Sequence, residues 1–81
     1  MQIHVLLFAQ LADTAGQRKL TLELADGATV HDAFDAVVAQ HNSLASMRNR
    51  IAFAINERYA QANHTLHDGD TLALIPPVSG G

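Results

Sequence analysis

The sequence predicts an α+β domain in which one main helix lies across one face of a mixed sheet of four to five strands. Apolar residues alternate with polar residues near both ends of the chain, which is typical of strands. Between them, residues 30–38 carry the apolar spacing of a helix. A chain of 81 residues forms one small domain, so the helix and the sheet must bury their apolar surfaces against each other.

Two strands are predicted first. Residues 2–8 suit a strand with Ile3, Val5 and Leu7 on one face and His4, Leu6 and Phe8 on the other. Residues 10–19 contain the turn formers Asp13, Thr14 and Gly16 and predict a loop with room for one helical turn. Leu20, Leu22 and Leu24 then alternate with Thr21 and Glu23. We expect these two strands to pair as a hairpin.

The main helix is expected to start after Thr29. Thr29 suits an N-cap, and Asp32 suits the first turn, where it meets free amides and the positive end of the helix dipole. The apolar stripe that would face the sheet is Val30, Ala33, Phe34, Val37 and Val38. Leu44, Met47 and Ile51 predict a short second helical piece.

The remaining chain predicts short strands and a tail. Residues 52–55 form an apolar run, residues 59–60 suit an edge strand, and residues 67–70 suit a turn. Residues 71–75 form the last strand, which ends at Pro76 because proline has no amide hydrogen. This order predicts a ubiquitin-like β-grasp domain over residues 1–75 and an extended tail over residues 76–81.

Four apolar residues are expected on the sheet face that the helix leaves uncovered. If the helix covers Ile3, Val5 and Leu7, then Leu6, Phe8 and Ile75 point away from it, and Tyr59 joins them. One interpretation is edge packing beneath the loop at residues 10–19. The alternative is a docking surface with apolar anchors for another protein.

The tail reads Pro76, Pro77, Val78, Ser79, Gly80 and Gly81, and its only ionic group is the terminal carboxylate. The prolines favour an extended exit, and six residues at about 3.3 Å each span roughly 20 Å. The two glycines lack Cβ atoms, so the walls of a partner's channel can close around them. We therefore expect the end of the chain to reach into the active site of another protein.

Composition limits the possible functions. The chain has no cysteine, so any sulfur chemistry must use another atom. A formal net charge of -3 argues against a nucleic-acid partner and favours a basic protein partner. No apolar run is long enough to span a membrane, and no signal peptide is recognisable, so we expect a cytoplasmic protein without a membrane partner. His64, His67, Asp68 and Asp70 are interpreted as a polar turn rather than a metal site.

Over essentially its whole length the chain resembles the small, sulfur-carrying subunit of molybdopterin synthase, within the ubiquitin-like sulfur carriers. The motifs of this resemblance are Phe8-Ala9 followed by Leu11, Ala54-Ile55-Asn56, Leu66 with Asp68-Gly69-Asp70, and most specifically the six-residue tail. The resemblance implies that Gly81 is adenylated, converted to a thiocarboxylate and used as the sulfur donor for the dithiolene of molybdopterin, built from cyclic pyranopterin monophosphate.

The resemblance also implies the partners. These are the large synthase subunit, in a heterotetramer of two small and two large subunits, an adenylyltransferase related to ubiquitin-activating enzymes, and a sulfur donor protein. Phe8, Tyr59 and Ile75 would contact the large subunit, and the tail would thread into its active site. The chain itself would bind no cofactor, because it has no Gly-rich phosphate loop, and ATP would bind to the activating partner.

Three other functions stay open on sequence alone. A ubiquitin-like modifier would use the same tail to form isopeptide bonds, and a carrier for thiamin thiazole synthesis would use it as a sulfur donor. The Pro76-Pro77 pair favours the molybdopterin carrier over both. A pure interaction module with an inert end is the remaining alternative.

Overall fold

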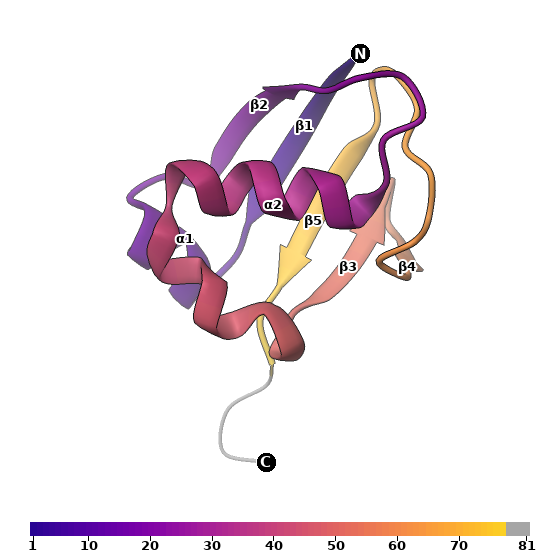
Figure 1. Ribbon diagram of the computed structural model, residues 1–81. Coiled ribbons are helices and arrows are strands. Elements are labelled where there is room, and N and C mark those ends of the chain that lie inside the picture. The colour runs from indigo at the N-terminus through magenta and orange to yellow at the C-terminus, as the bar shows by residue number, and fades with distance from the viewer. Residues whose placement is uncertain (78–81) are drawn as a thin grey trace.

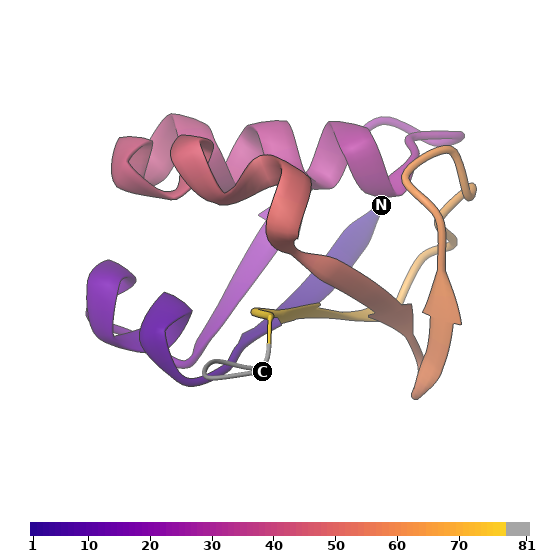
Figure 2. The same ribbon diagram turned by 90° about the horizontal axis from the view of Figure 1, so that it is seen from below.

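The computed structural model of the chain describes residues 1–77, which form a sheet with its main helix across one face (Figures 1 and 2). The five strands are β1 (Gln2–Leu7), β2 (Lys19–Glu23), β3 (Ala52–Ile55), β4 (Arg58–Ala60) and β5 (Thr71–Ile75). The helices are α1 (Gln10–Ala15), α2 (Val30–Gln40) and the 3₁₀ helix η1 (Asn42–Arg50). The predicted α+β, β-grasp fold is confirmed.

The sheet has the strand order β2-β1-β5-β3-β4. β1 pairs antiparallel with β2 and parallel with β5, and β3 pairs antiparallel with both β5 and β4. The expected antiparallel pairing of the first two strands and the expected edge position of the strand around Tyr59 are therefore confirmed. The parallel pairing of β1 with β5 places the first and last strands of the chain side by side in the middle of the sheet.

Helix α2 starts where the sequence predicts. The Thr29 hydroxyl accepts a hydrogen bond from the Asp32 backbone N–H at 3.3 Å, and the Asp32 carboxylate accepts one from the Thr29 N–H at 2.9 Å. This reciprocal capping box satisfies two amides that the first helical turn leaves free. Val30, Ala33, Phe34 and Val37 are fully buried against the sheet, while Val38 is half-buried.

The core lies between α2 and one face of the sheet (Figure 2). Its strand members are Ile3, Val5, Leu7, Leu22, Leu72 and Leu74, as the alternation predicts. Phe53 from β3 packs edge-to-face on Phe34 at a centroid distance of 5.9 Å. Burial of these side chains is the main stabilising term for so small a domain.

The connection between β1 and β2 differs from the expected loop. It contains a six-residue helix, α1, where the sequence predicted room for a single turn. Leu11 is fully buried and anchors α1 to the core, and Gly16 ends α1 in a left-handed conformation (φ 76°). A helix this short has weak intrinsic preference, so the tertiary burial of Leu11 decides its formation.

The second helical piece is confirmed as the 3₁₀ helix η1, with Leu44 buried, Met47 half-buried and Ile51 buried just beyond its end. Over residues 1–77, each helix is too short or too polar to cross a bilayer.

Candidate functional site

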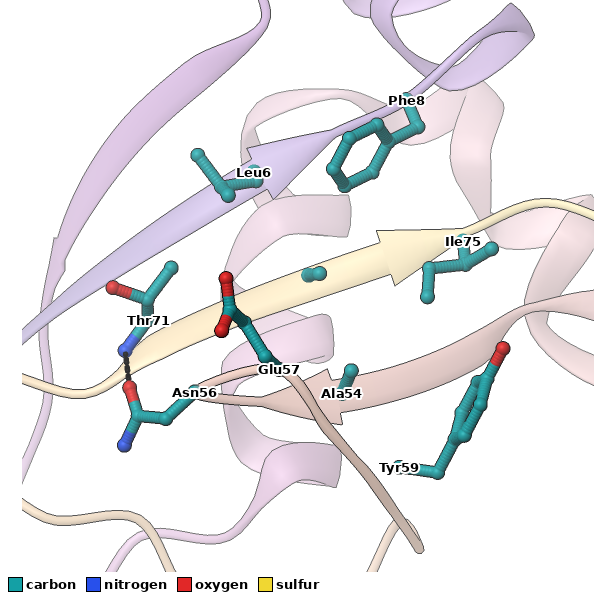
Figure 3. A pocket seen from close by; sticks show the side chains of 9 residues that line it. Leu6, Phe8, Ala54, Asn56, Glu57, Tyr59, Thr71 and Ile75 are labelled. Atoms are coloured by element: carbon teal, nitrogen blue, oxygen red, sulfur yellow. Dashed lines mark hydrogen bonds between the residues drawn. The ribbon is translucent and has the colours of Figure 1, made fainter.

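The sheet face opposite α2 carries an apolar hollow with a volume of about 590 Å³ (Figure 3). We call the surface around it the uncovered face. Its apolar lining residues are Leu6 on β1 and Phe8 just after β1, Ala54 on β3, Tyr59 on β4, and Ala73 and Ile75 on β5. The structure thus brings together Phe8, Tyr59 and Ile75, the three residues predicted from the sequence.

The strand register explains why these side chains meet. β1 and β5 run parallel with Leu7 opposite Leu74, so the next residues along the chain, Phe8 and Ile75, lie side by side on the other face. Figure 3 shows both near the end of β5, with Tyr59 across β3 from them. Phe8 is 46% exposed and Tyr59 is 81% exposed. Large exposed rings that line one apolar hollow are typical anchors of protein interfaces.

Sequence reasoning missed the polar border of the uncovered face, which consists of Asn56, Glu57 and Thr71. Asn56 and Glu57 form the turn between β3 and β4, and both adopt positive φ angles of 49° and 73°. The Asn56 side chain holds this turn against β5: its carbonyl oxygen accepts from the Thr71 N–H at 3.0 Å. Its amide donates to Asp70 at 2.9 Å. Ala54 was also missed, although alternation with the inward Phe53 and Ile55 places it on this face.

The last described residues continue from the uncovered face. Ile75 ends β5 opposite Ala52, Pro76 is half-buried, and Pro77 is exposed. The remaining predicted site residues, Val78, Ser79, Gly80 and Gly81, lie outside the described residues. The predicted tail therefore starts at the end of the central strand, beside Phe8.

The acidic turn at residues 67–70 has a structural role. Asp68 accepts from the Gln2 N–H at 2.7 Å, and Asp70 accepts from the His67 N–H at 2.8 Å as well as from Asn56. These carboxylates therefore hold backbone amides of the turn and of β1. Within residues 1–77, no three His, Asp or Glu side chains group as metal ligands.

A second polar cluster lies on the helix side, away from the uncovered face. The Arg48 guanidinium donates to Asp35 at 2.7 Å and lies over the Phe34 ring at 4.8 Å, and His31 lies 3.3 Å from Asp35. This cluster joins η1 to α2, so Arg48 is held by its own chain rather than presented to a partner.

The ThiS family model matches residues 5–81, so the chain belongs to the ThiS family. The molybdopterin synthase sulfur carrier subunit of Chlamydomonas reinhardtii is 43% identical over 100% of both chains. The small archaeal modifier protein 1 of Haloferax volcanii is 40% identical, over 93% of this chain and 95% of that protein.

Solved structures agree with this fold. The crystal structure of SAMP1 from Haloferax volcanii superposes with a TM-score of 0.91 at 36% identity, covering 100% of both chains. The Caldiarchaeum subterraneum ubiquitin has a TM-score of 0.68 at 26% identity, covering 100% of this chain and 98% of that one. One chain in a complex of subunits 1 and 2 of the Helicobacter pylori molybdopterin-converting factor superposes with a TM-score of 0.69 at 23% identity, covering 100% of both chains. This likeness shows the shared fold alone.

Proposed function

We propose that this chain is the sulfur-carrier subunit of a molybdopterin synthase. Gly81 is adenylated, converted to a thiocarboxylate and used to donate sulfur to cyclic pyranopterin monophosphate, which forms the dithiolene. The observation that carries this proposal is that Phe8, Tyr59 and Ile75 line one hollow, and that Ile75 ends the strand that leads to residues 76–81. The full-length similarity to the Chlamydomonas carrier subunit supports the same function.

The chemistry explains why the chain needs no catalytic side chain. A carboxylate resists nucleophiles, so its oxygen first attacks the α-phosphate of ATP, forming an acyl adenylate and releasing pyrophosphate. Hydrosulfide (HS⁻) from the sulfur donor then attacks the acyl carbon, the bond from that carbon to the AMP oxygen breaks, and the carboxyl end carries one sulfur in place of one oxygen as AMP leaves. The chain has no cysteine and no phosphate-binding loop, so the sulfur and the ATP are supplied by other proteins.

The uncovered face gives these partners a place to bind. The large synthase subunit covers Phe8, Tyr59 and Ile75 and receives residues 76–81 in its active site, within a heterotetramer of two small and two large subunits. The adenylyltransferase receives the same tail at an earlier step, and a sulfur donor protein then loads it. Because Ile75 belongs to both the face and the strand that leads to the tail, docking and tail insertion are coupled.

A protein modifier conjugated through Gly81 is the second candidate. It is favoured by the 40% identity to a Haloferax protein named as a small archaeal modifier. Both functions begin with an adenylated tail, and they differ in the group that attacks the acyl carbon. A sulfur nucleophile yields a carrier, whereas a lysine amine yields an isopeptide conjugate.

Intact mass spectrometry tests the proposal. We expect the purified chain, incubated with its adenylyltransferase, ATP and a sulfur donor, to gain about 16 Da as sulfur replaces oxygen. The loaded chain, added to the large subunit and the pyranopterin substrate, should return to its starting mass as molybdopterin forms. A chain whose mass never changes would refute the proposal, and adducts on lysines of other proteins would favour the modifier.

A further inference from the structure

A second hollow, with a volume of about 420 Å³, adjoins the uncovered face on the far side of Phe8. It lies between the end of β1, helix α1 and the start of β2. Leu6 and Phe8 line both hollows, and the second one adds Ala12 and Asp13 from α1 and the basic residues Arg18 and Lys19. We call it the basic hollow. The two hollows together form one continuous surface.

Two of the chain's five cationic side chains stand at the basic hollow. Arg18 and Lys19 are both exposed, and neither forms an ion pair with any described residue. Arg48, by contrast, is held by Asp35 at 2.7 Å. In a chain with a net charge of -3, an adjacent pair of unneutralised cations is a local reversal of sign. Asp13 is the single acidic residue of the described chain that lines this hollow.

The strand register directs one of these cations toward the uncovered face. Lys19 lies directly opposite Leu6 in the antiparallel β1–β2 pair, so both side chains point to the same side of the sheet. At the other border of the face, the Glu57 carboxylate lies above the sheet (Figure 3). The surface therefore has a basic side at β2, an apolar centre at β1 and β5, and an acidic residue at the β3–β4 turn.

We propose that the basic hollow receives a carboxylate-bearing segment of the protein that covers the uncovered face. This inference rests on the proposed docking function of that face. Exposed charges at the border of an apolar interface contribute little affinity each, but they steer the encounter and select one orientation. Arg18 and Lys19 lie at one border of the face and Glu57 lies at the other. A partner with the opposite charges at the facing positions docks in a single orientation, which directs residues 76–81 into its active site.

Matched variants with the large synthase subunit test this role. R18Q/K19Q removes both cations, and Q40E/N63D lowers the net charge equally at exposed positions on the helix side. We expect R18Q/K19Q to weaken binding about 3- to 20-fold at low salt and to slow association, with the difference shrinking as salt screens it. R18K/K19R, which keeps both charges, should bind like the unaltered chain. Equal binding by R18Q/K19Q and Q40E/N63D would overturn the proposal.

Phe8→Ala separates this inference from the proposed function. If Phe8→Ala weakens binding while R18Q/K19Q does not, the face docks the subunit and the basic hollow has no part in it. If neither variant affects binding, the docking function itself is wrong. Thermal melting of each variant, monitored by circular dichroism, ensures that only folded protein is compared.

Discussion

The side-chain oxygen of Asn56 lies 3.0 Å from the backbone nitrogen of Thr71 and accepts its hydrogen. The same two residues are joined a second time, because the Asn56 N–H donates to the Thr71 carbonyl at 2.9 Å. The turn that follows β3 is thus fastened to the first residue of β5. Since Tyr59 follows this turn by only a few residues, the contact also positions the far border of the uncovered face.

Replacing Asn56 should therefore destabilise the fold. Asn56→Ala removes two side-chain hydrogen bonds and places alanine at a φ of 49°, so we expect a loss of about 1–3 kcal/mol in the free energy of unfolding. Asn56→Gly loses the same bonds but tolerates the positive φ, so its loss should be smaller. Urea unfolding measures both. Asn56→Ala as stable as the unaltered protein would contradict this role.

Replacing Glu57 with glycine should instead stabilise the fold. Its φ of 73° lies in the left-handed region, where glycine is favoured over other residues at the second position of such turns. We expect Glu57→Gly to raise the free energy of unfolding by about 0.5–1 kcal/mol, since the strain relieved exceeds the added chain entropy. Glu57→Ala is the control, because it removes the carboxylate and keeps the strain. A similar gain in both variants would assign the effect to charge instead.

Phe8 should contribute to binding and not to folding. Its ring is 46% exposed and lies between the two hollows of the docking surface. We expect Phe8→Ala to weaken binding to the large synthase subunit by about 1–3 kcal/mol and to leave the melting temperature nearly unchanged. Val38→Ala, on the half-buried side of α2, is the control and should leave binding unchanged. Calorimetry on folded protein measures both, and equal affinity for all three chains would mean that Phe8 is not an anchor.

The end of the chain should be required for sulfur loading alone. Deletion of Gly81, or Gly81→Val, should abolish the mass gain in the loading reaction. The deletion shortens the tail that carries the reacting carboxyl group, and valine crowds that group with a branched side chain. Melting should not change, because β5 ends at Ile75 and its last core side chain is Leu74. Asn63→Asp, beside the first turn of α2, is a matched surface control that should load normally. Loading of the Gly81 deletion would show that sulfur is carried elsewhere.

Local patterns predicted most elements of the fold. Thr29 and Asp32 predicted the start of α2 because capping depends on residues three positions apart. The alternation of Leu72 and Leu74 with Ala73 and Ile75 predicted which face of β5 is buried, because side chains of a strand alternate. Helix α1 was underestimated because its formation depends on burial of Leu11 in a core assembled from distant segments.

The candidate site, like the fold, was predicted from the sequence only in part. The sequence by itself determined which residues are candidates: it has no cysteine, it contains the Gly80-Gly81 pair, and it predicts Phe8, Tyr59 and Ile75 as apolar residues outside the core. Only the tertiary structure decided that these three residues meet, and that Arg18 and Lys19 adjoin them. The reason is that alternation fixes the direction of a side chain within its own strand, whereas its neighbours depend on strand order and register, which are set by long-range packing of the whole sheet.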